Sequence, residues 1–106
     1  MWINVSADSN TNVDFCIKAD ALNTSTGDEI GLGNETYSAN TSDTNLTLPG
    51  LGAETSLTTS YVESSTNVST GGEDYFRFWL DVPVATASGT YNNTVSFKGV
   101  EAGTDC

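Results

Sequence analysis

The chain has 106 residues, a formal net charge of −11 and 37% hydrophobic residues, a share below the roughly 45% that is usual for a soluble globular domain. We therefore expect one small domain, residues 1–106. The negative charge repels nucleic acids, and the sequence has no histidine to act as a general base or metal ligand, so we expect no nucleic-acid binding, no enzymatic activity and no cofactor.

Uncharged polar residues dominate the chain, because Asn, Thr and Ser make up 38 of the 106 residues. Their side chains compete with the backbone hydrogen bonds of a helix interior, which favours strands. Alternation of hydrophobic and polar residues, bounded by turn-forming residues, predicts seven strands. In chain order, these strands are 2–7, 13–19, 29–32, 45–48, 56–62, 75–82 and 91–98.

Seven short strands without a long helix predict an all-β fold in which two antiparallel sheets pack face to face, as an immunoglobulin-like β-sandwich. We expect the polar segments 36–44 and 64–72 to be exposed loops. The alternation predicts a core made of Phe15, Ile17, Phe76, Phe78, Leu80, Val95 and Phe97.

The opposite face of the strand at 75–82 carries Tyr75, Arg77 and Trp79. Packing within the protein, including a cation–π contact of the arginine, is the favoured interpretation. If this face is exposed, its aromatic rings could instead stack on sugars or pack on another subunit.

Cys16 and Cys106 are the only cysteines. We expect them to form a disulfide on the outside of the sandwich, because Cys16 alternates with the core residues on its strand. Two free thiols, or a bond from Cys106 to another subunit, are the alternatives.

Seven of the ten asparagines begin an Asn-X-Ser/Thr sequence, where chance would supply about 2 or 3. This excess predicts a secreted protein with covalent N-glycans, although accidental matches in a Thr-rich strand protein are the alternative. The acceptors are Asn4, Asn23, Asn34, Asn40, Asn45, Asn67 and Asn92.

Alternate oxygen-bearing side chains near the start of the chain form a weak calcium candidate. They are Asp8, Asn10, Asn12 and Asp14. Val13 and Ala19 occupy the positions where the helix-loop-helix calcium motif needs Gly and Glu, so we favour a polar connection between strands and expect no metal. The acidic pairs 28–29 and 73–74 lie in Gly-bounded turns and are expected to be solvated.

The motifs DVP at 81–83, ASGTY at 87–91 and TVSF at 94–97 look like the last two strands of secreted prokaryotic immunoglobulin-like domains. The motifs NVS at 4–6 and VDF at 13–15 near the start of the chain add to this resemblance. In these features the chain is similar to archaeal cell-surface proteins, including bundling pilins, and to the TasA and camelysin-like biofilm fibre proteins. It also resembles the head domains of archaeal type IV pilins and archaellins, families that carry an apolar N-terminal helix, so as a member of them the chain is expected to be the head alone.

The resemblance implies a structural subunit that polymerises when an N-terminal strand of one copy completes the sheet of the next. Trp2, Ile3 and Val5 are the candidate assembly strand, because they form an apolar segment near a terminus. The expected partners are copies of the same chain at an extracellular cell surface. A carbohydrate-binding or adhesive surface module is the alternative function.

No run of 18 apolar residues occurs, and the first residues lead into polar sequence without the regions of a signal peptide. We expect no membrane insertion by this segment. The chain is expected to be a processed product or a piece of a longer protein.

Overall fold

The structure is a computed structural model that describes residues 1–41 and 54–106. Over these ranges the chain forms short strands and one 3-10 turn of three residues, so the predicted all-β class is confirmed. In chain order the elements are β1 (Trp2–Asn4), β2 (Val13–Ala19), β3 (Leu22–Asn23), β4 (Glu29–Ile30), η1 (Leu32–Asn34), β5 (Glu35–Asn40), β6 (Thr55–Ser56), β7 (Val62–Val68), β8 (Glu73–Leu80) and β9 (Val95–Glu101).

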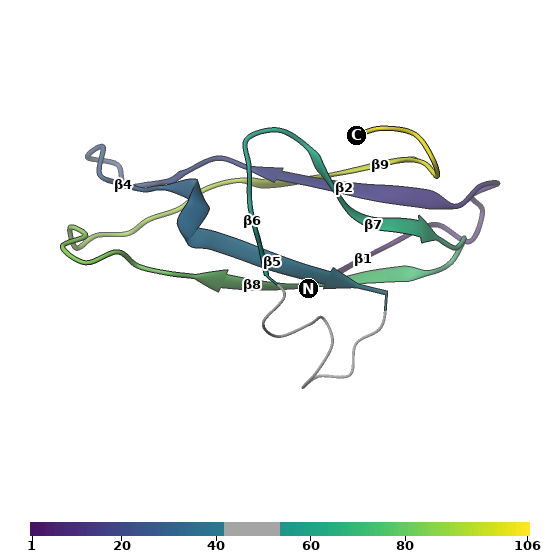
Figure 1. Ribbon diagram of the computed structural model, residues 1–106, viewed down its shortest axis with the longest axis horizontal. Helices are drawn as coiled ribbons and strands as arrows, with labels where there is room; N and C mark the ends of the chain where they lie inside the picture. Colours follow the sequence, from purple (N-terminus) through teal and green to yellow (C-terminus); the bar gives the residue numbers. More distant parts are fainter. Residues whose placement is uncertain (42–53) are drawn as a thin grey trace.

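The strands form two main sheets that lie face to face (Figure 1). One sheet, here called the β8 sheet, has the order β1-β8-β5-β6. The other, the β2 sheet, has the order β7-β2-β9, and β3 and β4 form a separate hairpin. Every strand pair is antiparallel, as the sandwich prediction requires.

The two terminal strands do not follow the immunoglobulin order. In that fold the first strand lies beside the second and the last strand lies beside the one before it. Here β1 pairs with β8, and β9 pairs with β2. The immunoglobulin-like detail of the prediction is therefore not confirmed, and both terminal strands are paired with partners far away in the sequence.

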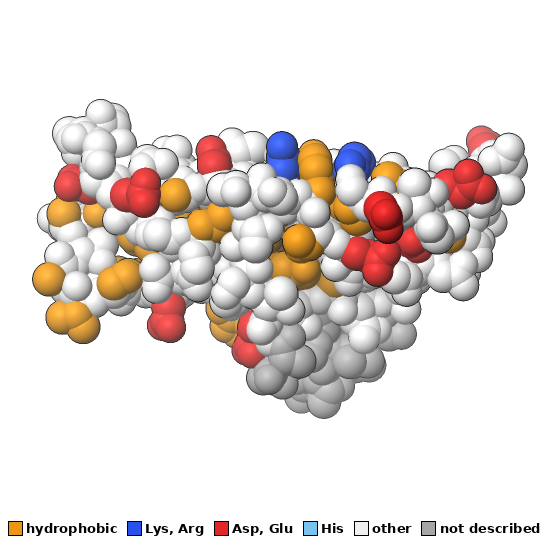
Figure 2. Space-filling view, turned by 45° about the horizontal axis from the view of Figure 1, so that its top comes forward, with side chains coloured by type: hydrophobic (Ala, Val, Ile, Leu, Met, Phe, Trp, Pro, Cys, Tyr) orange, Lys and Arg blue, Asp and Glu red, His pale blue; other side chains and the backbone are white. Residues whose placement is uncertain are grey.

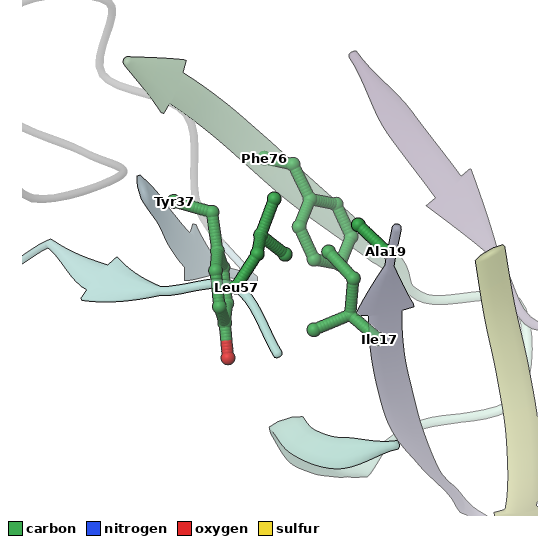
Figure 3. Close-up of a cluster of buried hydrophobic side chains, with 5 residues drawn as sticks. All are labelled: Ile17, Ala19, Tyr37, Leu57 and Phe76. Carbon is green, nitrogen blue, oxygen red and sulfur yellow. The ribbon is translucent and has the colours of Figure 1, made fainter. Parts of the chain in front are cut away.

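The core lies between the sheets and has two clusters of buried side chains. In the larger one, Ile17 and Ala19 of the β2 sheet face Tyr37, Leu57 and Phe76 from the opposite side (Figure 3). The smaller cluster consists of Val5, Phe15 and Val68. Both clusters contain residues from distant parts of the chain, so the core closes only when the sheets meet.

The predicted core is correct in part. Phe15, Ile17 and Phe76 are buried, while Phe78, Val95 and Phe97 are partly buried and pack against the larger cluster. The prediction that Leu80 belongs to the core is wrong, because 47% of its surface is exposed. It is the last residue of β8, so the alternation continues beyond the part of the strand that the core covers.

The predicted loops at 36–44 and 64–72 are also corrected, because they contain most of β5 and β7. In β7 two hydroxyls bond to the rest of the fold: Ser64 Oγ donates to the Phe15 carbonyl at 3.0 Å and Ser65 Oγ donates to Asp74 at 2.7 Å. Serine at these positions hides the hydrophobic alternation on which the prediction depends.

The predicted strand boundaries shift at several places. Most of the segment 56–62 is not a strand, the strand at 91–98 begins only at Val95, and β3 is not among the predicted strands. The predicted strands at 2–7 and 29–32 are shorter in the structure. The predicted strand at 45–48 lies outside the described residues.

Candidate functional site

The N-terminal strand β1 lies at the edge of the β8 sheet. Its register pairs Trp2 with Tyr75, Ile3 with Asp74 and Asn4 with Glu73. Main-chain bonds extend the pairing in both directions. The Phe76 N–H donates to the Met1 carbonyl at 2.9 Å, and the Val5 N–H donates to the Gly72 carbonyl at 2.9 Å. Segment 1–5 is therefore held to β8 chiefly by main-chain hydrogen bonds along an edge.

The three residues of the candidate assembly strand have different surroundings. Trp2 is 56% exposed, Ile3 is half-buried against both core clusters, and Val5 is buried with Phe15 and Val68. The inward side chains thus fill the gap between the sheets, while the Trp2 side chain remains largely in solvent. Segment 1–5 completes both the sheet and the core.

Asp74 of β8, the cross-strand partner of Ile3, is fully buried. Its Oδ1 accepts the Ser65 hydroxyl at 2.7 Å, whereas Oδ2 has no hydrogen-bond partner among the described residues. Burial raises the pKa of the Asp74 carboxyl to about 6 against the opposing effect of the Ser65 hydrogen bond. Burial, and then the Asp74 charge, raise the pKa of Tyr37.

The expectation that residues 73–74 lie in a solvated turn is therefore wrong. The sequence contains a signal that would place Asp74 correctly: it has the same parity as Phe76 and Phe78, which point into the core.

The outer face of the β8 sheet carries the aromatic side chains that alternate with the core residues of β8. Trp2 and Tyr75 are cross-strand neighbours, and Arg77 and Trp79 follow Tyr75 along β8. The Tyr75 hydroxyl donates to the Glu73 carboxylate. Tyr75, Arg77 and Trp79 are half-buried and belong to neither core cluster, and their packing within the protein stays a prediction.

The oxygen-bearing residues of the calcium candidate have different surroundings. Asp8 and Asn10 are exposed, while Asp14 is buried and accepts the N–H groups of Asn67 at 2.7 Å and Gly103 at 2.9 Å. These two bonds, that from Asn67 first, lower the pKa of Asp14. Residues 1–41 and 54–106 contain no group of three or more acidic, cysteine or histidine side chains arranged to hold a metal ion.

The sulfur atoms of Cys16 and Cys106 lie 2.00 Å apart, at bonding distance. Cys16 is buried on β2, and Cys106 ends the segment that follows β9. Lys98 Nζ donates to the Cys106 carbonyl. The pair thus fastens residues 102–106 against the β2 sheet, and Asp14 holds the same segment through Gly103.

Two of the three basic side chains of the sequence lie near the Cys16–Cys106 pair and contact the same aromatic ring. Lys18 Nζ and Lys98 Nζ lie 4.7 Å and 4.5 Å from the centre of the Tyr61 ring, distances at which cations are attracted to an aromatic face. Two basic side chains stand close together along the upper part of Figure 2, whereas acidic side chains are spread across the molecule.

None of the predicted glycan acceptors in the described ranges is buried. Asn34 and Asn40 are half-buried, and Asn45 lies outside the described residues. The exposed acceptors are Asn4, Asn23, Asn67 and Asn92.

Comparison of the chain with protein-family models, curated proteins and solved structures found no match. Among the described residues, no helix has the length and hydrophobicity needed to cross a membrane.

Proposed function

We propose that this protein is an extracellular, N-glycosylated structural subunit of a cell-surface filament or surface layer, and that its N-terminal strand completes the β8 sheet of the next subunit. The observation that carries this proposal is the position of segment 1–5. It lies at a sheet edge, it is paired with β8 through the main chain, and its inward side chains fill the core. A segment with these properties from a second copy makes the same contacts.

The connection from β1 to β2 supports an exchange of this strand. Residues 6–12 are mostly polar, and local bonds, such as that from the Ser9 N–H to the Ser6 carbonyl at 3.0 Å, form the turn there. No residue of segment 6–12 belongs to either hydrophobic cluster. The release of β1 from its own β8 would uncover Phe15 and Val68, and a second copy's Val5 would cover them again.

The disulfide and the glycan acceptors support the extracellular part of the proposal. Disulfides persist in oxidising compartments, and glycan acceptors must be accessible. Measurement of the intact mass before and after removal of N-linked glycans tests this part directly. A native protein with all seven acceptors unmodified would contradict it.

A covalent lock on β1 tests the assembly mechanism. Asn4 and Glu73 are directly opposite each other, next to the bond from the Val5 N–H to the Gly72 carbonyl. They therefore occupy a non-hydrogen-bonded position, where side chains lie close together. The double variant Asn4→Cys/Glu73→Cys should form a disulfide that keeps β1 on its own β8.

We expect the locked protein to be folded and monomeric, with no filaments in negative-stain micrographs. The matched variant Asn4→Ser/Glu73→Ser lacks the lock and should assemble like the wild type. Filaments or layers formed by the oxidised locked variant would show that exchange of β1 is not the mechanism, and no assembly by the wild type would refute the proposal itself.

A carbohydrate-binding or adhesive module is the second candidate. Three aromatic side chains on the outer face of the β8 sheet, Trp2, Tyr75 and Trp79, favour it, because partly exposed aromatic rings can stack on sugars. Binding of free oligosaccharides that is lost in Trp79→Ala would support this function, and a glycan array without a hit would argue against it.

A further inference from the structure

Two glycan acceptors and two aromatic side chains meet on the outer face of the β8 sheet. Asn40 of β5 pairs with Tyr75 of β8, and Tyr75 pairs in turn with Trp2 of β1, so the three residues form a row across the sheet. Asn4 lies two residues after Trp2 on β1, and alternate side chains of a strand point to the same face. The Trp2–Tyr75 pair thus has a glycan acceptor on either side.

Trp2 and Asn4 are both accessible. Trp2 is 56% exposed, Asn4 is exposed, and residues two apart on a strand are separated by about 7 Å. Within the Trp2–Tyr75 pair the side chains are close, because this position lies between two hydrogen-bonded pairs, Met1–Phe76 and Ile3–Asp74. The exposed Trp2 side chain therefore lies on the same face as Asn4, with the Tyr75 side chain across from it on β8.

A sugar ring is chemically suited to this surface. Its C–H groups carry a small positive charge, and an aromatic ring has a negatively charged face that is strongest in tryptophan. A sugar bound covalently to Asn4 also has a far higher local concentration than a free oligosaccharide, since only its rotation about the linkage must be restricted.

From this arrangement, and resting on the proposed glycosylation, we infer that Trp2 is the binding surface for the sugar attached to Asn4. The first ring of the glycan stacks on the indole, and Tyr75 extends the surface on the β8 side. The glycan covers the Trp2 side chain on the outward side of β1. It leaves the main chain and the inward residues Ile3 and Val5 available for pairing with β8.

The direct test is nuclear magnetic resonance on the glycoprotein secreted by cells that attach N-linked sugars. Protons of the sugar on Asn4 should shift upfield through the ring current of the indole and show cross-relaxation with its protons. Both signals should disappear in Trp2→Ala. They should persist in Trp79→Ala, which removes the other tryptophan of the same face and serves as the matched control.

A thermal double-mutant cycle measures the same contact. Asn4→Gln should lower the melting temperature of the wild type and leave that of Trp2→Ala unchanged. Asn23→Gln, at an exposed acceptor on β3, should have an equal effect in both backgrounds.

Three results would overturn the inference: an unmodified Asn4 beside other occupied acceptors, a glycan on Asn4 without ring-current shifts, or shifts that vanish in Asn40→Gln instead of Asn4→Gln. None of them affects the locked-strand experiment, which tests assembly. Conversely, a stacked glycan on a protein that never assembles would refute the filament proposal and leave this contact intact.

Discussion

At the scale of single residues, two buried carboxyls respond to pH in opposite directions. Asp14 accepts two main-chain N–H groups, which favour its charged form and lower its pKa. Burial favours the neutral form of Asp74 and outweighs the hydrogen bonds from Ser65 and the Tyr75 main chain, and its Oδ2 has no hydrogen-bond partner among the described residues. Burial therefore dominates the pKa of Asp74, whereas the two main-chain donors dominate that of Asp14.

We predict that Asp74→Asn is more stable than the wild type at neutral pH, because the variant has no buried carboxyl that ionises. The unfolded chain releases this proton near the ordinary aspartate pKa of 3.8, whereas the folded protein retains it up to about pH 6. The folded state binds more protons between these values, so its stability decreases as the pH rises through them. The asparagine variant should therefore gain stability relative to the wild type, on the order of 1 to 3 kcal/mol, between about pH 3.5 and pH 7.

Chemical denaturation at several pH values measures this difference, because the other titrating groups are common to both proteins. Ser65→Ala provides a second test. It removes a hydrogen bond that favours the charged form, so the decrease in stability should extend to higher pH. A difference between wild type and Asp74→Asn that is independent of pH would contradict the prediction.

At the scale of elements, the sequence predicts strands well where hydrophobic residues alternate and poorly where hydroxyls take their place. β2 and β8 are predictable because they carry Phe15, Ile17, Phe76 and Phe78. The sequence predicts a loop at β7, since the inward position 65 holds a serine that bonds to Asp74 and not a hydrophobic side chain that packs in the core. A bond between a serine and a buried carboxyl depends on two strands that come together in space, and no local pattern encodes it.

The turn between β7 and β8 provides a test at this scale. The Gly72 N–H donates to the Ser69 carbonyl at 2.8 Å, and a Cβ on Gly72 would lie 2.8 Å from that same oxygen. Gly72→Ala must therefore distort the turn that bonds to Val5. We expect a cost of about 1 to 3 kcal/mol in the free energy of unfolding, as for other overpacked sites.

Gly33→Ala is the matched control, because no atom lies within 4 Å of a Cβ at that position. Its free energy of unfolding should stay within about 0.5 kcal/mol of the wild-type value. If the two alanine variants prove equally stable, the close approach at Gly72 does not constrain the turn.

At the scale of the whole molecule, each terminal strand pairs with a strand that is distant in the sequence. β1 pairs with β8 and β9 pairs with β2, so the candidate assembly strand and the disulfide lie on different sheets. The cysteine pair is predictable from the even cysteine count, and its side of β2 follows from the alternation along that strand. The pairing of β1 with β8 and of β9 with β2 is not predictable in this way, because strand order depends on long-range contacts that a local sequence pattern does not contain.

The disulfide is expected to stabilise the whole fold. It joins residues 90 apart in sequence, and the entropy of so long a closed loop corresponds to about 4.6 kcal/mol. Cys16→Ala/Cys106→Ala should therefore lower the free energy of unfolding by about that amount, measured by denaturation with and without reductant. The Gly103 amide, which Asp14 holds in the structure, should lose its protection from hydrogen exchange as the segment after β9 loosens. Wild-type protein that runs as a reductant-sensitive dimer, or a double variant as stable as the wild type, would show that Cys106 does not fasten its own chain.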